Sequence, residues 1–189
     1  MGAAVRIEAS DRTWHRGDRA RLIRLFSMGA STVYAPLGLA SAAGTPRLGD
    51  AFVLVAVGVS FHLFAFPLND VIDLPIDRTN ARRSDGPLVR GLVRPQTMLL
   101  VALFQLPVMA ALLVAGGAST AAWLAWLAAV ACLGAYVLWG KRMSLPGAPD
   151  MIQGVGFAAL LVMGASWAGE PTVVSWLAAA YVVVYIVQI

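Results

Sequence analysis

Charged side chains are scarce in this chain of 189 residues: 13% are Asp, Glu, Lys or Arg, whereas 59% are hydrophobic. The mean hydropathy is +0.75. A soluble domain of this length cannot bury so much apolar surface, so the composition predicts an integral membrane protein. Cysteine is almost absent as well. The single Cys132 lies in an apolar run, which excludes an internal disulfide framework and predicts a small core residue.

Internal repeats are lacking, and no polar linker divides the chain. Instead, six apolar stretches with the length of a membrane-spanning helix follow one another. We place them at residues 20–41, 51–68, 97–116, 119–139, 151–168 and 172–189. Because backbone amides in lipid must bond within their own segment, we expect an all-α membrane bundle. We expect a single domain over residues 20–189, preceded by a basic leader at residues 1–19.

Basic residues are nearly missing from alternate connections between these stretches. Of the fourteen Lys and Arg residues, Arg47 alone lies after the first, third or fifth stretch. The positive-inside rule therefore predicts that both termini and the loops 69–96 and 140–150 are cytoplasmic. A cleaved signal peptide ending near residues 40–42 is an alternative. The long charged leader and the interruption at Arg24 disfavour it.

One short stretch breaks the apolar pattern, because residues 69–77 read NDVIDLPID. At 100° per residue, Asp70, Asp73 and Asp77 fall on one helical face. Pro75 predicts a kink or a break of this helix close to it. Carboxylates gathered in this way suit Mg²⁺, which prefers hard oxygen ligands and completes its shell with water and phosphate oxygens.

Arginines follow these carboxylates directly. The next loop supplies Arg78, Arg82, Arg83 and Arg90, which can clamp an anion bridged to the metal. Carboxylates for metal beside arginines for phosphate indicate a diphosphate site. The alternative is a solvated loop whose exposed ion pairs contribute little. His62, about two turns before the motif, is expected to hydrogen-bond a neighbouring helix.

These residues resemble the UbiA-type membrane prenyltransferases. The matches to that family's first Asp-rich motif, NDxxDxxxD, are Asn69, Asp70, Asp73 and Asp77. The continuation from Asp77 to Gly91 is similar to the family's DRTNxR and RPLxxG run. Residues 136–142, YVLWGKR, are similar to the tyrosine and the Lys-Arg pair that follow the family's fourth helix.

The resemblance implies a helical bundle around a cavity that opens towards lipid. It implies Mg²⁺-dependent transfer of a prenyl group from an allylic prenyl diphosphate to an aromatic or other lipophilic acceptor. The residues implied in catalysis and metal binding are Asp70, Asp73 and Asp77. The residues implied in diphosphate binding are Asn69, Arg78, Arg82, Lys141 and Arg142. The expected partners are these substrates, membrane lipid, and another copy or a partner subunit, but no nucleic acid.

The chain departs from the family pattern in two places. Gly86 takes the place of the usual arginine before Pro87, and Asp85 adds a negative charge beside it. The second Asp-rich motif, which follows the family's sixth helix, is absent, since no acidic residue follows Glu170. We therefore expect about six of the family's roughly nine helices, with the chain representing the N-terminal part.

Three other functions stay open at this point. A truncated relative would bind a prenyl or lipid diphosphate without turning it over, as a carrier or partner subunit. A phosphatidyltransferase of the CDP-alcohol class also uses membrane aspartates and Mg²⁺, but here Ala81-Arg82 precedes Asp85-Gly86, which reverses the order of its DG…AR run. A transporter that couples ions is expected to carry its aspartates deeper in the membrane.

Overall fold

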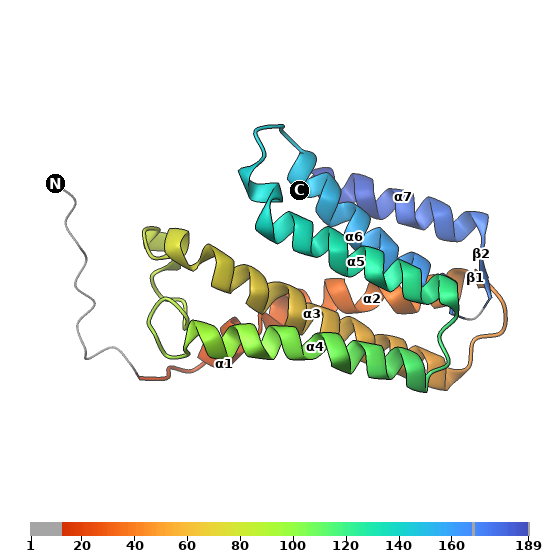
Figure 1. Ribbon diagram of the computed structural model, residues 1–189, viewed down its shortest axis with the longest axis horizontal. Coiled ribbons are helices and arrows are strands. Elements are labelled where there is room, and N and C mark those ends of the chain that lie inside the picture. The colour runs from red at the N-terminus through yellow and green to blue at the C-terminus, as the bar shows by residue number, and fades with distance from the viewer. Residues whose placement is uncertain (1–12, 168, 189) are drawn as a thin grey trace.

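The computed structural model describes residues 13–167 and 169–188 as an elongated bundle of helices (Figure 1). The α-helices are α1 (Asp18–Leu22), α2 (Leu25–Ser41), α3 (Leu48–Asp77), α4 (Pro95–Ala115), α5 (Thr120–Leu138), α6 (Ala148–Ala165) and α7 (Val173–Gln188). The shorter elements are β1 (Ala42–Ala43), the 3-10 helices η2 (Ala81–Arg83) and η3 (Gly140–Arg142), and β2 (Glu170–Pro171). Residues 1–12 of the predicted leader lie outside the described part.

The six longer helices α2 to α7 coincide with the six predicted spans. Four of them, α3 to α6, are long and apolar enough to cross a membrane, and α7 is a shorter apolar helix of 16 residues. The chain is therefore an all-α integral membrane protein, as the composition predicts. The predicted break near Pro75 does not occur, because α3 continues through this residue to Asp77. Pro75, like Pro67 in the interior of α3, lacks one backbone N–H, and the remaining hydrogen bonds carry the helix past it.

Helix α2 lies in the centre of the bundle, packed against α3 on one side and α6 on the other. Glycines make this possible. A Cβ atom at Gly164 of α6 would overlap the carbonyl oxygen of Ala35, and one at Gly38 of α2 would overlap that of Leu161. The two backbones are therefore in direct contact, the approach that small residues allow between membrane helices. Helix α4 packs on the far side of α3, and α5 and α7 pack on α6.

The two ends of the bundle differ in kind (Figure 1). We call the end where α3 terminates, with the loop 78–94 and η3, the polar end. At the opposite end, which we call the clipped end, β1 pairs antiparallel with β2, with Ala42 opposite Pro171. There the hydroxyl of Thr172 donates to the carbonyl of Ser41 at 2.7 Å, and the hydroxyls of Ser41 and Ser175 lie 2.9 Å apart.

Candidate functional site

The polar end holds the larger of two cavities near the Asp-rich motif, with a volume of about 650 Å³. The lining residues come from the α1–α2 junction, the last turns of α3 and the following loop. Its basic lining residues are Arg21, Arg24, Arg82 and Arg83, and its acidic ones are Asp70, Asp77 and Asp85. Leu74 and Leu88 belong to a small apolar cluster that lines the same cavity. Four guanidinium groups and three carboxylates thus surround one space, a mixture that suits an anion carrying a metal cation.

A smaller cavity, of about 120 Å³, lies between α3, α5 and α6. Apolar side chains such as Phe66 and Phe157 line it together with the polar groups of Asn69, Tyr136 and Gln153. Of the residues lining these two cavities, Arg24 is the one that lines both. Asp70 and Asp77 of α3 therefore line the larger cavity, whereas Phe66 and Asn69 of α3 line the smaller one. Arg24 lies between the two cavities.

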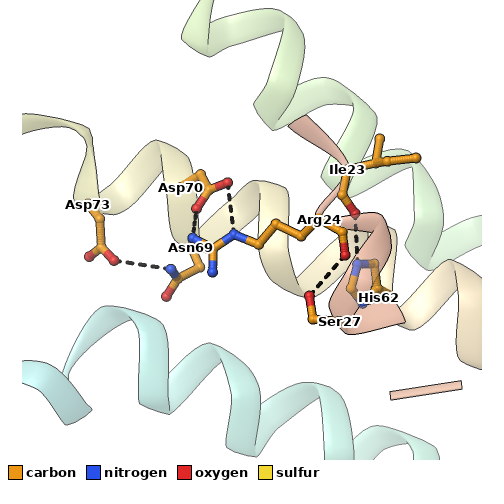
Figure 2. Close-up of polar contacts among 7 residues, drawn as sticks. All are labelled: Ile23, Arg24, Ser27, His62, Asn69, Asp70 and Asp73. Atoms are coloured by element: carbon orange, nitrogen blue, oxygen red, sulfur yellow. Dashed lines mark hydrogen bonds and ion pairs between the residues drawn. The ribbon is translucent and has the colours of Figure 1, made fainter. Parts of the chain in front are cut away.

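Arg24 pairs with Asp70 across the boundary between these cavities (Figure 2). Its Nη2 contacts Oδ1 of Asp70, and its Nε donates to Oδ2 at 3.4 Å. The side chains of Arg24 and Asp70 are 27% and 18% exposed, so the pair is only partly enclosed. The guanidinium carbon of Arg24 also lies 5.3 Å from the centre of the Phe66 ring, a cation–π distance.

The α1–α2 junction that presents Arg24 is anchored on α3 through His62. The Nε2–H of this buried histidine donates to the carbonyl of Ile23 at 2.8 Å, which leaves Nδ1 to accept from the hydroxyl of Ser31, also at 2.8 Å. The prediction that His62 hydrogen-bonds a neighbouring helix is confirmed. Arg24 itself has φ 45° and ψ 49°, a left-handed backbone that is uncommon outside glycine. The hydroxyl of Ser27 donates to its carbonyl at 2.9 Å.

The predicted carboxylate triad is divided. Asp70 and Asp77 line the larger cavity, whereas Asp73 accepts a hydrogen bond of 3.1 Å from Nδ2 of Asn69. Figure 2 shows Asp70 turned towards Arg24 and Asp73 turned towards Asn69. Within residues 13–167 and 169–188, no three His, Cys, Asp or Glu side chains come together in a group able to hold a metal ion. The expectation that three carboxylates gather in one group is therefore not met.

The residues predicted to bind diphosphate are also only partly brought together. Arg82 lines the larger cavity and Asn69 the smaller one. Arg78 is exposed at the end of α3, and Arg142 is exposed in η3. The side chain of Lys141 lies outside the described part. The residues that sequence reasoning did not assign to the site are Arg21, Arg24 and Asp85. The signal for Arg24 was an ionisable residue at the start of an apolar stretch, which is a functional candidate by default.

Arg90 does not take part in the predicted anion clamp. It donates from Nη1 to Oδ2 of Asp18 at 3.0 Å and from Nη2 to the carbonyl of Thr13 at 2.6 Å. Its side chain is 7% exposed and that of Asp18 is 2% exposed. The backbone N–H of His15 also donates to Asp18, at 2.7 Å. Arg90 thus fastens the segment before α2 to the loop that lines the cavity.

The pKa of Asp18 is lowered below its usual 3.8. The hydrogen bond from the His15 backbone is the largest cause, and the hydrogen bond and charge of Arg90 add to it, while burial opposes them. A carboxylate with such partners keeps its charge to a lower pH than an exposed one. The clamp between Asp18 and Arg90 therefore stays ionised across the physiological range.

The residues fit a divalent cation in their chemistry. Mg²⁺ takes hard oxygen ligands and is commonly held by one or two protein carboxylates, with water and substrate phosphate completing its shell. Asp70 and Asp77 supply two carboxylates to one cavity, and Asp70 already holds a cationic group, the Arg24 guanidinium. The arginines of the cavity wall supply the charge that a phosphate-bearing substrate needs.

Comparison with known proteins gives a family and a fold. The sequence matches the model of the UbiA prenyltransferase family over residues 30–189. The structure is similar to the apo structure of a UbiA homolog from Aeropyrum pernix K1, with a TM-score of 0.70 and 23% sequence identity. The similarity covers 92% of this chain and 62% of that chain, so this chain spans less than two thirds of that relative. No curated protein matches the sequence.

Proposed function

Because the chain belongs to the UbiA prenyltransferase family, we propose that it transfers a prenyl group within the membrane. The donor is an allylic prenyl diphosphate and the acceptor is an aromatic or other lipophilic molecule. The observation that carries the proposal is the cavity at the polar end, where Asp70 and Asp77 face four arginines. In this proposal residues 20–189 form the catalytic domain, residues 1–19 form a leader, and the polar end lies on the cytoplasmic side, as the distribution of Lys and Arg favours.

The chemistry is an ionisation followed by an alkylation. The bond between the allylic carbon and the diphosphate oxygen breaks, and the electron pair leaves with the diphosphate. The acceptor then forms a bond to the allylic carbon and releases a proton. Mg²⁺ held by Asp70 and Asp77 would neutralise negative charge on the departing diphosphate. Asp73, which accepts from Asn69 on the adjacent face of α3, would join these two carboxylates only by turning away from Asn69.

The chain's own residues have three tasks in this reaction. Arg82 and Arg83 bind phosphate oxygens through charge-assisted hydrogen bonds, which hold the leaving group in the cavity. The apolar lining of the smaller cavity, including Phe66 and Phe157, excludes water from the allylic cation. Asn69, Tyr136 and Gln153 give this cavity the polar groups that orient a hydroxyl or carbonyl of the acceptor.

The test uses the full chain in liposomes with Mg²⁺, prenyl diphosphates of different lengths and a panel of aromatic acceptors. We expect diphosphate release and a prenylated acceptor in the mass spectrum. Asp77→Asn should abolish Mg²⁺-dependent binding of the prenyl diphosphate, and transfer should fall on the order of a hundredfold or more. Its helical circular dichroism should not change.

Two results would contradict the proposal. Unchanged binding in Asp77→Asn would rule out the proposed metal site in the larger cavity. Tight binding of prenyl diphosphate by the wild-type chain without any release would favour the alternative, a membrane protein or partner subunit that holds a prenyl or lipid diphosphate without turning it over.

A further inference from the structure

Arg24 is held in place by its backbone as well as by its side chain. The carbonyl before it accepts from His62, its own carbonyl accepts from Ser27, and its backbone is left-handed. A non-glycine residue in this conformation is strained, and it persists where its surroundings fix it. The junction between α1 and α2 is therefore built to direct this guanidinium at Asp70.

The Arg24 guanidinium binds the Asp70 carboxylate, which a metal ion would need as a ligand. Both oxygens of Asp70 contact Arg24, one through Nη2 and the other through Nε. A carboxylate that already accepts from both arms of a guanidinium has few lone pairs left for a divalent cation. Arg24 and a divalent cation therefore compete for the same oxygens.

The surroundings allow this contact to be exchanged. The pair is partly exposed and adjoins the larger cavity, in contrast to the enclosed pair of Asp18 and Arg90. Arg24 also lines the smaller cavity and lies against the Phe66 ring, so its guanidinium has an aromatic neighbour that does not depend on Asp70. Because the pair borders the larger cavity, water or a cation can reach Asp70 and replace Arg24 without unpacking the helices.

We propose that Arg24 is an internal counter-ion of Asp70 that a divalent cation must displace to bind. The inference rests on the proposed function, since it assigns Asp70 to the metal site. Arg24 then acts as a positioning residue that holds the cation-free site in a defined state. It keeps the Asp70 carboxylate neutralised and the boundary between the two cavities closed until the cation arrives.

The test measures binding of Mn²⁺ alone, as a paramagnetic probe for a Mg²⁺ site, by counting free Mn²⁺ in the electron paramagnetic resonance spectrum of the purified full chain. Arg24→Gln should bind Mn²⁺ about tenfold more tightly than the wild type, since a competing charge-assisted contact is gone. Arg21→Gln is the matched control. It removes the same charge from the same cavity without removing the partner of Asp70, and we expect a change of about twofold.

A double-mutant cycle separates competition from a general charge effect. In an Asp70→Asn background, Arg24→Gln should change Mn²⁺ affinity no more than Arg21→Gln does. Equal gains for Arg24→Gln and Arg21→Gln in the wild-type background would overturn the counter-ion proposal and leave the proposed function standing. Absence of Mn²⁺ binding in every variant, with circular dichroism unchanged, would overturn both the counter-ion and the metal site on which the proposed function depends.

Discussion

The two ends of this bundle use the same helices for opposite purposes. At the clipped end, α2 and α6 touch through Gly38 and Gly164, and hydroxyl groups and a two-residue strand pair join the end of α2 to the start of α7. At the polar end the start of α2 borders the larger cavity and the start of α6 borders the smaller one, and ionisable and aromatic groups line these cavities. One end is packed backbone to backbone, and the other leaves space.

The difference teaches where stability and function are located in the chain. Contacts that a single methyl group would destroy lie towards the clipped end, and groups that can exchange partners lie at the polar end. Changes at the glycine contacts of the clipped end should therefore destabilise the protein, whereas changes to the ionisable groups of the polar end should alter binding and leave the fold intact. Three predictions test this division.

The largest effect is expected at Gly164. Its replacement by Val would place side-chain atoms inside the backbone of α2 at Ala35, so α2 and α6 must separate. We expect a loss of about 3 kcal/mol or more in the free energy of unfolding, the upper range for overpacking. Thermal unfolding in detergent, followed by circular dichroism, measures it.

The matched control for Gly164 is Gly134→Ala in α5, where an added Cβ meets no heavy atom within 4 Å. That change should stabilise slightly, by less than about 1 kcal/mol, because alanine favours a helix more than glycine does. Equal stability of Gly164→Val and Gly134→Ala would show that the close approach of α2 and α6 is not needed.

An intermediate effect, limited to activity, is expected when the two ends of α3 are compared directly. Asp70→Asn at the polar end should reduce prenyl transfer on the order of a hundredfold and shift the unfolding temperature little. Asp50→Asn at the other end removes a charge that serves only the start of the helix, where Asp50 accepts from the backbone N–H of Arg47 at 3.0 Å. It should leave transfer unchanged. Similar losses of activity in both variants would contradict the division between the ends.

The smallest effect concerns the clamp between Asp18 and Arg90, and it depends on pH. The pKa of Asp18 is lowered in the folded chain, so the clamp's contribution is complete above the unfolded value of 3.8 and is lost as the pH falls through the lower folded value. The rate of backbone hydrogen exchange in residues 13–22, corrected for the intrinsic rate, should increase as the pH falls through this acidic window. It should stay constant from pH 5 to 8. In Asp18→Asn the pH dependence should disappear. A transition near neutral pH would assign the exchange to another group.

Much of the fold could be predicted from the sequence because lipid imposes a simple rule. Each apolar stretch must form a helix to satisfy its backbone, so all six spans and their order follow from composition. Of the kink or break expected near Pro75, the break does not occur, because the loss of one backbone hydrogen bond does not end a helix that its other hydrogen bonds hold. The central place of α2 could not be predicted, since Gly38 and Gly164 lie 126 positions apart in sequence (164 minus 38) and neither signals its partner.

The candidate site could be predicted only where it is local in sequence. The Asp-rich motif and the two arginines of η2 lie within one short segment, so their closeness follows from the sequence. Arg24, Arg21 and the pairing of Arg90 with Asp18 depend on how the segment before α2 folds back over α3. The helical spacing of the motif also does not predict that Asp73 accepts a hydrogen bond from Asn69 while Asp70 pairs with Arg24.

The length of α3 sets the depth at which the proposed chemistry takes place. Its 30 residues rise about 45 Å at 1.5 Å each, whereas the hydrocarbon core of a bilayer is about 30 Å thick. If α3 stands roughly upright, its last turns reach the headgroup layer, so Asp70 and Asp77 meet water without the chain opening. In the proposed reaction, a metal ion and the released diphosphate can then exchange with the aqueous phase, while the prenyl chain stays in the hydrocarbon layer. The length of α3 thus separates the water-soluble reactants, at its end, from the lipid-soluble ones, along its apolar part.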